Sequence, residues 1–398
     1  MAFDPELATR AWLATLSGPA RARSDAYFEG GYLLLFVDAA ITIAVTWATL
    51  RFGWAARLSA WAGRRRDGSA RRPAVHALRF LPAYILLTTL LTLPWAIWEQ
   101  FVREHDYGLS TQSFPAWAGE AAIAITINLV AVTLLFTGIH AAIRRAPRDW
   151  WLGATGITIA GLAFFILIAP VVVEPLFNRY TPLPAGPVRT AVLSMARANG
   201  IPAENVFVVD ASRQTTRISA NVAGLGATTR IALNDNLLKQ PPDEIRAVMA
   251  HEMGHYVLGH VTKLLVALAI LAALLFLFVA RALPALLARF GAGWGVARLD
   301  DPAIFAPVTI LLTIAFLALT PLFNTLIRTQ EIEADRFGLN VARAPEAFAS
   351  IAVKLGQYRK LEPGPWEEAV FYDHPSGRTR VLTAMRWKAE HLGQSDIR

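Results

Sequence analysis

Six long apolar runs constrain this chain more than any other feature of its sequence. An α-helix needs about 20 apolar residues to cross the ~30 Å hydrocarbon layer of a bilayer. The runs cover residues 30–50, 80–98, 121–143, 150–173, 264–280 and 302–327. A charged fraction of only 17% and a mean hydropathy of +0.40 agree with them. The sequence therefore predicts a mainly α-helical, multi-span membrane protein and excludes an ordinary soluble enzyme.

The charged residues are mostly basic and lie in the connections between the apolar runs. The formal net charge is +8, and the connection over residues 51–79 is rich in arginine. Beside apolar spans, this charge indicates contact with anionic lipid headgroups, and no nucleic-acid-binding motif accompanies it. The chain has no cysteine, which excludes disulfides, thiolate metal ligands and a cysteine nucleophile. The first residues contain acidic side chains and no early apolar core, so we expect no cleavable signal peptide.

The strongest chemical motif is the segment DEIRAVMAHEMGHYVLGHV over residues 243–261. Acidic residues in the first turn and helically spaced apolar residues predict a helix. His251 and His255 then lie on one face about one turn apart, where both imidazoles can hold one metal ion. Glu252 resembles the general base of the His-Glu-x-x-His zinc peptidases. The alternative is an ordinary polar helix face. Because no turn signal follows, we expect one long helix that carries these histidines and then enters the bilayer as the run 264–280.

A catalytic zinc site needs a third protein ligand and one open position. Glu331 is the candidate, because Glu331 and Asp335 share one helix face while Glu333 lies roughly opposite. Asp335 would then orient a ligating histidine. The alternative is a surface helix with solvated carboxylates. His260 is a poor ligand candidate, since five residues after His255 it points about 140° away round a helix, and we expect it to pack or to form a hydrogen bond.

The composition over residues 174–240 changes to that of a soluble segment. Helical periodicity covers residues 188–199, and 206–209 is a short strand. Residues 217–222 and 230–233 flank Gly224-Leu225-Gly226 as a hairpin. An edge strand beside the histidine helix can hold an extended peptide through main-chain hydrogen bonds. The pattern leaves open whether the hairpin binds substrate or only buttresses the helix.

Eight collinear stretches give the chain a resemblance to a known family. They are AYFEGGYLLLF, LPWAIWEQFVREHDYGLSTQ, APVVVEPLFNRYTPLP, VFVVDASRQTTRISANVAGLG, RIALND, AHEMGHYVLGH, EIEADRFG and HPSGRTR. They resemble the type I CAAX prenyl proteases, integral-membrane zinc endopeptidases of the gluzincin kind, from about residue 25 to about residue 387. The resemblance implies a ring of membrane helices round a large water-filled chamber. The first span of this chain aligns with the second of the seven family helices, so about six helices would form the chamber here.

The resemblance also implies a metal site. By this resemblance we expect one Zn²⁺ per chain, bound by His251, His255 and Glu331. The general base falls on Glu252, and the acid that orients a ligand falls on Asp335.

Substrate-binding positions follow from the same resemblance. The family's edge strand falls on Ser219, Ala220 and Asn221, and its histidine and arginine pair near the zinc falls on His374 and Arg380. We expect His374 to donate a hydrogen bond to the developing oxyanion. The alternative is a histidine that only begins a helix.

The predicted function is that of a membrane-embedded zinc metalloendopeptidase. We expect the chain to be divided into an N-terminal lead over 1–29, four transmembrane helices over 30–173, a zinc-peptidase core over 174–263, two transmembrane helices over 264–327 and a C-terminal segment with the third ligand over 328–398. Its partners are a peptide or protein substrate and the lipid bilayer, without nucleic acid. CAAX-like C termini and membrane proteins in quality control are both candidate substrates, and the oligomeric state stays open.

The competing prediction is a non-enzymatic membrane protein. It would be either a transporter that uses Asp38 and His140 in its spans or a scaffold derived from a peptidase. A scaffold is expected to have lost a ligand or the base, and all four positions are intact. A transporter is expected to have more polar residues and paired broken helices in its spans.

Two arguments disagree on which side of the membrane the zinc site faces. Six spans place both chain ends and the site on one side and the Arg-rich connection 51–79 on the other. The positive-inside rule puts that connection in the cytoplasm, whereas the resemblance puts the catalytic domain there. We expect the cytoplasmic site, in an inner membrane if the source is bacterial.

Overall fold

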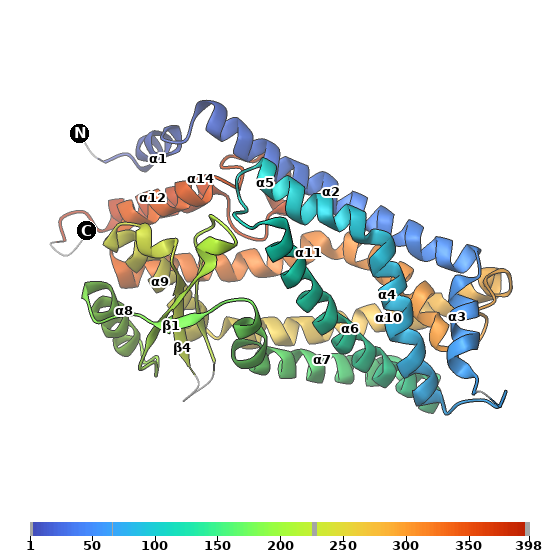
Figure 1. Ribbon diagram of the computed structural model, residues 1–398. Helices are drawn as coiled ribbons and strands as arrows, with labels where there is room; N and C mark the ends of the chain where they lie inside the picture. Colours follow the sequence, from blue (N-terminus) through green and yellow to red (C-terminus); the bar gives the residue numbers. More distant parts are fainter. Residues whose placement is uncertain (1–2, 66, 225–228, 395–398) are drawn as a thin grey trace.

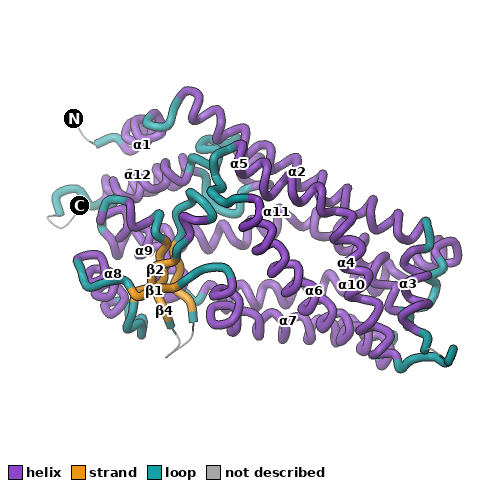
Figure 2. The backbone as a smooth tube through the Cα atoms, viewed as in Figure 1, coloured by secondary structure: helices purple, strands orange, loops and turns teal. Residues whose placement is uncertain are grey.

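The computed structural model describes residues 3–65, 67–224 and 229–394. Long helices dominate, and a small sheet occupies one end of the molecule (Figures 1 and 2). The α-helices are α1 (Pro5–Ala14), α2 (Gly18–Arg51), α3 (Trp54–Gly63), α4 (Pro73–Ile97), α5 (Glu104–Asp106), α6 (Phe114–Arg145), α7 (Trp150–Ile168), α8 (Pro187–Ala198), α9 (Pro242–Val257), α10 (His260–Trp294), α11 (Phe305–Ala342), α12 (Pro345–Leu355), α13 (Pro365–Phe371) and α14 (Gly377–Glu390).

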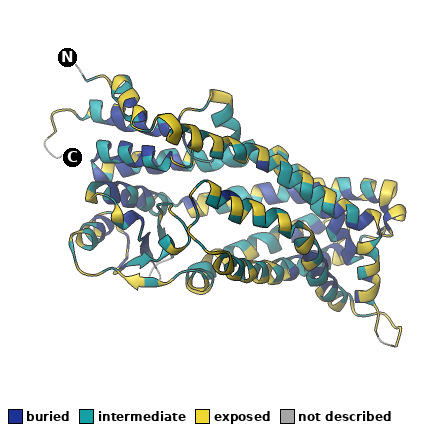
Figure 3. Cartoon of the chain, turned by 45° about the horizontal axis from the view of Figure 1, so that its top comes forward, coloured by how far each residue is buried: buried dark blue, intermediate teal, exposed yellow. Residues whose placement is uncertain are grey.

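The six predicted membrane spans are confirmed as helices. Within the described residues, six helical segments are long and apolar enough to cross a bilayer: Gly18–Arg51, Pro73–Asp106, Phe114–Arg145, Trp150–Leu176, His260–Trp294 and Pro302–Ala342. Large apolar side chains on them remain exposed, among them Leu90, Leu134 and Phe164, each more than half exposed. Exposed residues run along the outer sides of these helices in Figure 3. A bilayer, and not water, is the solvent that suits such surfaces.

Prolines inside the spans are accompanied by π-helical segments, through which the helical backbone continues. Pro94 lies one turn before the π-helical segment Trp98–Arg103, which continues α4. Pro170 lies inside a second π-helical segment, Ala169–Val173, at the end of α7. A proline removes one hydrogen bond and clashes with the preceding turn, and a π-helical turn accommodates both effects.

The soluble end of the molecule contains a four-stranded sheet of order β1-β2-β4-β3. Its strands are β1 (Tyr180–Pro182), β2 (Val206–Val209), β3 (Ala220–Ala223) and β4 (Arg230–Asn234). The predicted hairpin is confirmed by antiparallel pairing of β3 with β4, although Leu225 and Gly226 lie outside the described residues. The sequence missed β1, because prolines flank and interrupt the segment.

Helix α9 packs against this sheet. Ile231 and Leu233 of β4 and Met249 and Ala250 of α9 are almost fully buried in one apolar cluster. Strand β3 lies at the edge of the sheet among the described strands. The helix with the two histidines is therefore held directly beside an edge strand, as the sequence predicted.

The prediction that one continuous helix carries the histidines and then enters the bilayer is wrong. Helix α9 ends at Val257, and α10 begins at His260. Gly259 between them has φ +67°, a left-handed conformation that glycine adopts readily and that ends α-helices. A continuous helix exists elsewhere: α11 runs unbroken from the apolar span to Ala342, with Pro321 inside it.

Candidate metal centre

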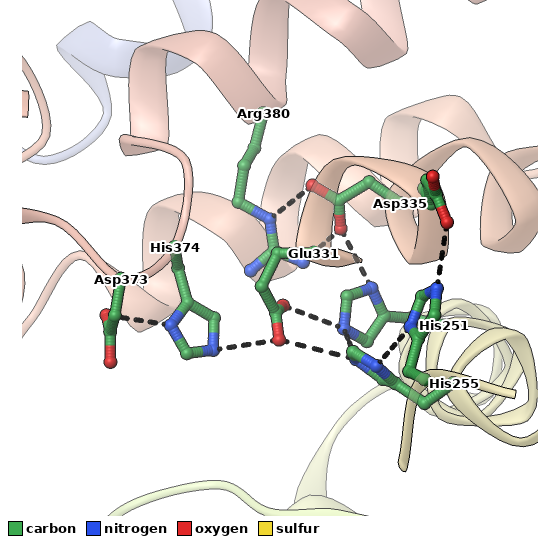
Figure 4. Close-up of polar contacts among 9 residues, drawn as sticks. His251, His255, Glu331, Asp335, Asp373, His374 and Arg380 are labelled. Atoms are coloured by element: carbon green, nitrogen blue, oxygen red, sulfur yellow. Dashed lines mark hydrogen bonds and ion pairs between the residues drawn. The ribbon is translucent and has the colours of Figure 1, made fainter. Parts of the chain in front are cut away.

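Helices α9 and α11 approach one another closely where the candidate ligands lie. A Cβ atom placed on Gly338 of α11 would lie 3.0 Å from the backbone nitrogen of His251 and 3.1 Å from its Cα. Such distances are too short for a side chain, so glycine is what permits this contact. The crossing brings histidines from α9 and carboxylates from α11 into one cluster (Figure 4).

Three predicted ligands converge in this cluster. His251 Nε2 lies 3.1 Å from His255 Nε2 and 3.3 Å from Glu331 Oε2. His255 Nε2 lies 3.4 Å from Glu331 Oε1. Within the described part of the chain, His251, His255 and Glu331 form the group of side chains that could hold a metal ion, with one ligand atom from each within 4.8 Å of the others.

The donor set fits a zinc ion on three grounds. Ligand atoms at about 2.0–2.1 Å from a tetrahedral zinc lie roughly 3.3 Å from one another, close to the separations found here. Glu331 Oε2 is buried, and apart from its 3.3 Å contact with His251 Nε2 it has no hydrogen-bond partner among the described residues, which suits an oxygen that binds a cation. Two imidazoles and one carboxylate are ligands that zinc accepts.

Asp335 and Arg380 lie behind the first histidine. His251 Nδ1 is 2.8 Å from Asp335 Oδ1. The guanidinium of Arg380 donates to both oxygens of the same carboxylate, from Nε to Oδ2 at 3.0 Å and from Nη2 to Oδ1 at 2.6 Å. The role predicted for Asp335, orientation of a ligating histidine, therefore has the required geometry. Arg380, which was predicted among the substrate-binding residues, also lines the pocket that contains Glu252, so its place beside a substrate stays a prediction.

His374 approaches the cluster from the loop before α14. Its Nε2 lies 3.3 Å from Glu331 Oε1, and its Nδ1 lies 2.8 Å from Asp373 Oδ1. The sequence analysis did not single out Asp373. Its position beside His374 in the Asp-His-Pro segment is the signal that could have found it, because carboxylates commonly orient histidines.

Glu252 lines the same pocket as the three ligands. Desolvation raises the pKa of Glu252, the charges of His251 and Arg380 lower it and that of Glu331 raises it, and the net result is a pKa of about 7. Desolvation and the charge of His251 lower the pKa of His255 to about 4, which favours the neutral imidazole that binds metals.

The pocket has a volume of about 340 Å³ and continues from the cluster to the edge strand. Ser219 and Ala220 line it, whereas Asn221 does not, and the buried Oδ1 of Asn221 has no hydrogen-bond partner in the described chain. Phe348, Ile351 and Leu355 of α12 form an apolar wall. The pocket thus joins a cluster of metal-binding type, an edge strand and an apolar surface.

His260 and Glu333, which were not expected to be metal ligands, form a second cluster beside the first. His260 Nδ1 lies 2.8 Å from His255 Nδ1, and His260 Nε2 lies 3.1 Å from Glu333 Oε2. The prediction that His260 forms a hydrogen bond is confirmed. The prediction that it points away from the site is wrong, because it assumed a continuous helix and the backbone turns at Gly259.

The two intramembrane residues considered for transport have structural partners. Trp95 Nε1 donates to Asp38 Oδ1 at 2.6 Å. His140 Nε2 lies 3.0 Å from the carbonyl oxygen of Asp300. Both contacts tie separate segments of the helical bundle together.

Two sequence-family models cover most of the chain. Residues 182–388 match peptidase family M48, and residues 21–179 match a model described as CAAX prenyl protease N-terminal, five membrane helices. Among the described residues, that second stretch contains four of the candidate membrane helices.

Individual proteins are similar over most of their length. An uncharacterized metalloprotease, YhfN, of Bacillus subtilis is 31% identical over 305 residues, which are 75% of this chain and 71% of the relative. A CAAX prenyl protease 1 homolog of Oryza sativa is 27% identical, over 91% of this chain and 86% of its own. The crystal structure of S. mikatae Ste24p superposes with a TM-score of 0.74 at 21% identity, covering 96% and 95% of the two chains, and so has the same fold.

Proposed function

Because the chain belongs to peptidase family M48 and is a membrane metalloprotease of the CAAX prenyl protease type, we propose that it is a zinc endopeptidase with its catalytic centre at the α9–α11 crossing. One observation carries this proposal. His251, His255 and Glu331 converge within 4.8 Å in the pocket that Glu252 also lines.

The proposed ligands of Zn²⁺ are His251 and His255, through Nε2, and Glu331, through its carboxylate. Zinc at such a site supplies a Lewis acid and makes water a nucleophile near neutral pH. Asp335 keeps the ring of His251 in place, and Arg380 neutralises the buried charge of Asp335. This arrangement leaves the pocket side of the cluster open to substrate.

Glu252 is the proposed general base. It takes a proton from the attacking water and passes that proton to the amine that leaves. Burial raises the pKa of Glu252 above that of an exposed carboxyl, the direction that strengthens a proton acceptor. His374 is proposed to act as an imidazolium, which donates from Nδ1 to Asp373 and from Nε2 to the oxyanion that develops on the scissile carbonyl.

The substrate is proposed to bind as an added strand along β3. Ser219, Ala220 and Asn221 lie along this sheet edge. Ser219 O accepts from Asn234 N of β4 at 2.9 Å, so the main-chain groups of Ala220, which alternate to the open side, are the ones proposed to bind an extended peptide with little demand on sequence. The apolar wall of α12 supplies a surface for an apolar substrate side chain. Polypeptides associated with the membrane fit this site, either as CAAX-like C termini or as membrane proteins in quality control.

The two substrate classes can be separated with purified protein. CAAX-ending peptides, with and without a prenyl group, and an unprenylated membrane protein are incubated with the enzyme in detergent, and products are identified by mass spectrometry. Cleavage only of the prenylated peptide favours the first class, and cleavage of all three favours the second. If none is cut by a sample that contains one zinc per chain, or if chelation by 1,10-phenanthroline leaves cleavage unchanged, the proposed function fails.

The site is further proposed to face the cytoplasm. Six spans put the N-terminal lead, the zinc-peptidase core and the C-terminal segment on one side of the membrane. The positive-inside rule applies to short loops, and long folded segments are placed largely regardless of their charge. The Arg-rich connection on the opposite side therefore does not decide the orientation alone.

A further inference from the structure

We propose that His260 and Glu333 position His255 for metal binding, by fixing which of its ring nitrogens carries the proton. This inference rests on the proposed function, because it assigns a supporting role toward the same zinc ion. Neither residue touches the ion or the substrate in this assignment.

The break between α9 and α10 is what brings His260 to the site. On a continuous helix, His260 would lie about 140° round from His255. With Gly259 at φ +67°, the next helix starts in a new direction and places the two Nδ1 atoms 2.8 Å apart. His260 is almost completely buried, at 2% exposure, so both of its ring nitrogens need partners.

A single arrangement of protons satisfies every contact in this cluster. A zinc ligand on Nε2 leaves His255 with its proton on Nδ1, which donates to Nδ1 of His260 at 2.8 Å. His260 then carries its own proton on Nε2, which donates to Glu333 Oε2 at 3.1 Å. Lys263 Nζ donates to the same oxygen at 2.7 Å from the exposed side of the cluster.

The opposite arrangement is incompatible with metal binding. If His260 carried its proton on Nδ1, it would donate to His255, whose proton would move to Nε2 and block the ligand atom. The contact of His260 Nε2 with Glu333 Oε2 at 3.1 Å places a carboxylate oxygen, which is an acceptor, opposite that nitrogen and so favours the productive arrangement. Hydrogen-bonded partners of metal-ligating histidines act in this way. Asp335 holds His251 on one side of the cluster, and His260 with Glu333 holds His255 on the other.

The test measures zinc affinity of the full-length protein in detergent, by competition with a chelator of known Kd. We expect His260→Ala to weaken binding by about 10- to 100-fold, and Glu333→Ala by ~10-fold. His260→Gln should recover part of the loss, since its amide oxygen can accept from His255. Lys263→Ala is the matched control, because Lys263 contacts Glu333 but lies half exposed and away from His255, and it should change the affinity by less than about threefold.

Substitution of cobalt for zinc adds a spectroscopic measurement that a purely structural role of His260 would leave unchanged. The visible absorption of bound Co²⁺ reports the orientation of its ligands, and we expect it to shift in His260→Ala and Glu333→Ala but not in Lys263→Ala. Because Glu333 is 43% exposed at its side chain, its substitution leaves the fold intact even if His260→Ala unfolds the protein. Wild-type affinity and spectrum in Glu333→Ala would overturn the proposal. Failure of the proposed function looks different: wild-type protein would bind no zinc, or His255→Ala would bind it normally.

Discussion

Arg380 and Asp335 form a buried, two-pronged ion pair, with both carboxylate oxygens accepting from one guanidinium at 3.0 Å and 2.6 Å. Both residues are less than a tenth exposed. Loss of one partner leaves the other charge buried without compensation, which costs about 3–5 kcal/mol. The pair therefore supports the fold around the metal cluster as well as the metal cluster itself.

The first prediction is that Arg380→Ala lowers the melting temperature strongly and weakens zinc binding. Arg380→Lys should fall between this variant and wild type, because an ammonium cannot make two parallel hydrogen bonds. Thermal unfolding in detergent and metal analysis measure both effects. If Arg380 instead served only to bind substrate, Arg380→Ala would raise KM while the melting temperature and zinc content stayed at wild-type values.

Glu252→Gln tests the general base. We expect the variant to retain one zinc per chain and to lose about 10²- to 10⁴-fold in kcat, since the ligands remain while the proton acceptor is gone. The measurement is peptide hydrolysis alongside metal analysis of the same sample. A variant within about threefold of wild type would contradict the assignment. His255→Ala is the companion control, in which the metal itself should be lost.

Glu331→Ala and Glu333→Ala distinguish the third ligand from its neighbour. Glu331 faces both ligating histidines, whereas Glu333 contacts His260 and Lys263. At saturating zinc we expect Glu331→Ala to be empty and Glu333→Ala to be filled, though with weaker affinity. An empty Glu333→Ala beside a filled Glu331→Ala would mean that the ligand assignment on α11 is wrong.

Gly338→Ala tests the close contact of α9 and α11. The added methyl group would meet the His251 backbone at 3.0–3.1 Å, and we expect a destabilisation of about 1–3 kcal/mol with loss of zinc affinity. Gly156→Ala on α7 is the control, because a Cβ there meets no atom within 4 Å. Melting temperatures of the two variants, compared with wild type, measure the effect. Equal stability of both variants would show that the helices have room to separate.

The orientation in the membrane is tested with single cysteines on this cysteine-free chain. Ser69→Cys reports the Arg-rich connection, and Gly364→Cys reports the segment before α13; both positions are exposed. For a cytoplasmic site, an impermeant thiol reagent should label Ser69→Cys in intact cells and leave Gly364→Cys protected until the cells are opened. The reverse pattern would place the catalytic side outside.

The membrane spans and the clustering of His251 with His255 could be predicted because each depends on local regularity. Long apolar runs have few structural solutions in a bilayer, and four-residue spacing places His251 beside His255 on any helix. Helical geometry also predicted that Glu331, and not Glu333, lies on the helix face that meets the two histidines, and the structure places Glu331 with them.

The helix boundaries could not be predicted in the same way. Gly259 looks no more disruptive in sequence than Gly254, yet only Gly259 takes a positive φ. Glycine tolerates both helical and left-handed backbone, and tertiary contacts decide which occurs. The position of His260 depended on that choice. Asp373 and the engagement of Arg380 with Asp335 likewise depend on how distant segments pack.

The two helices that meet at Gly338 come from distant parts of the chain, and this fixes the order in which the centre can be made. During synthesis His251 and His255 emerge well before α11 is complete, and α11 must cross the bilayer before Glu331 and Asp335 reach them. His374 and Arg380 follow later still. A nascent chain therefore lacks part of the proposed centre until α11 has been inserted into the membrane.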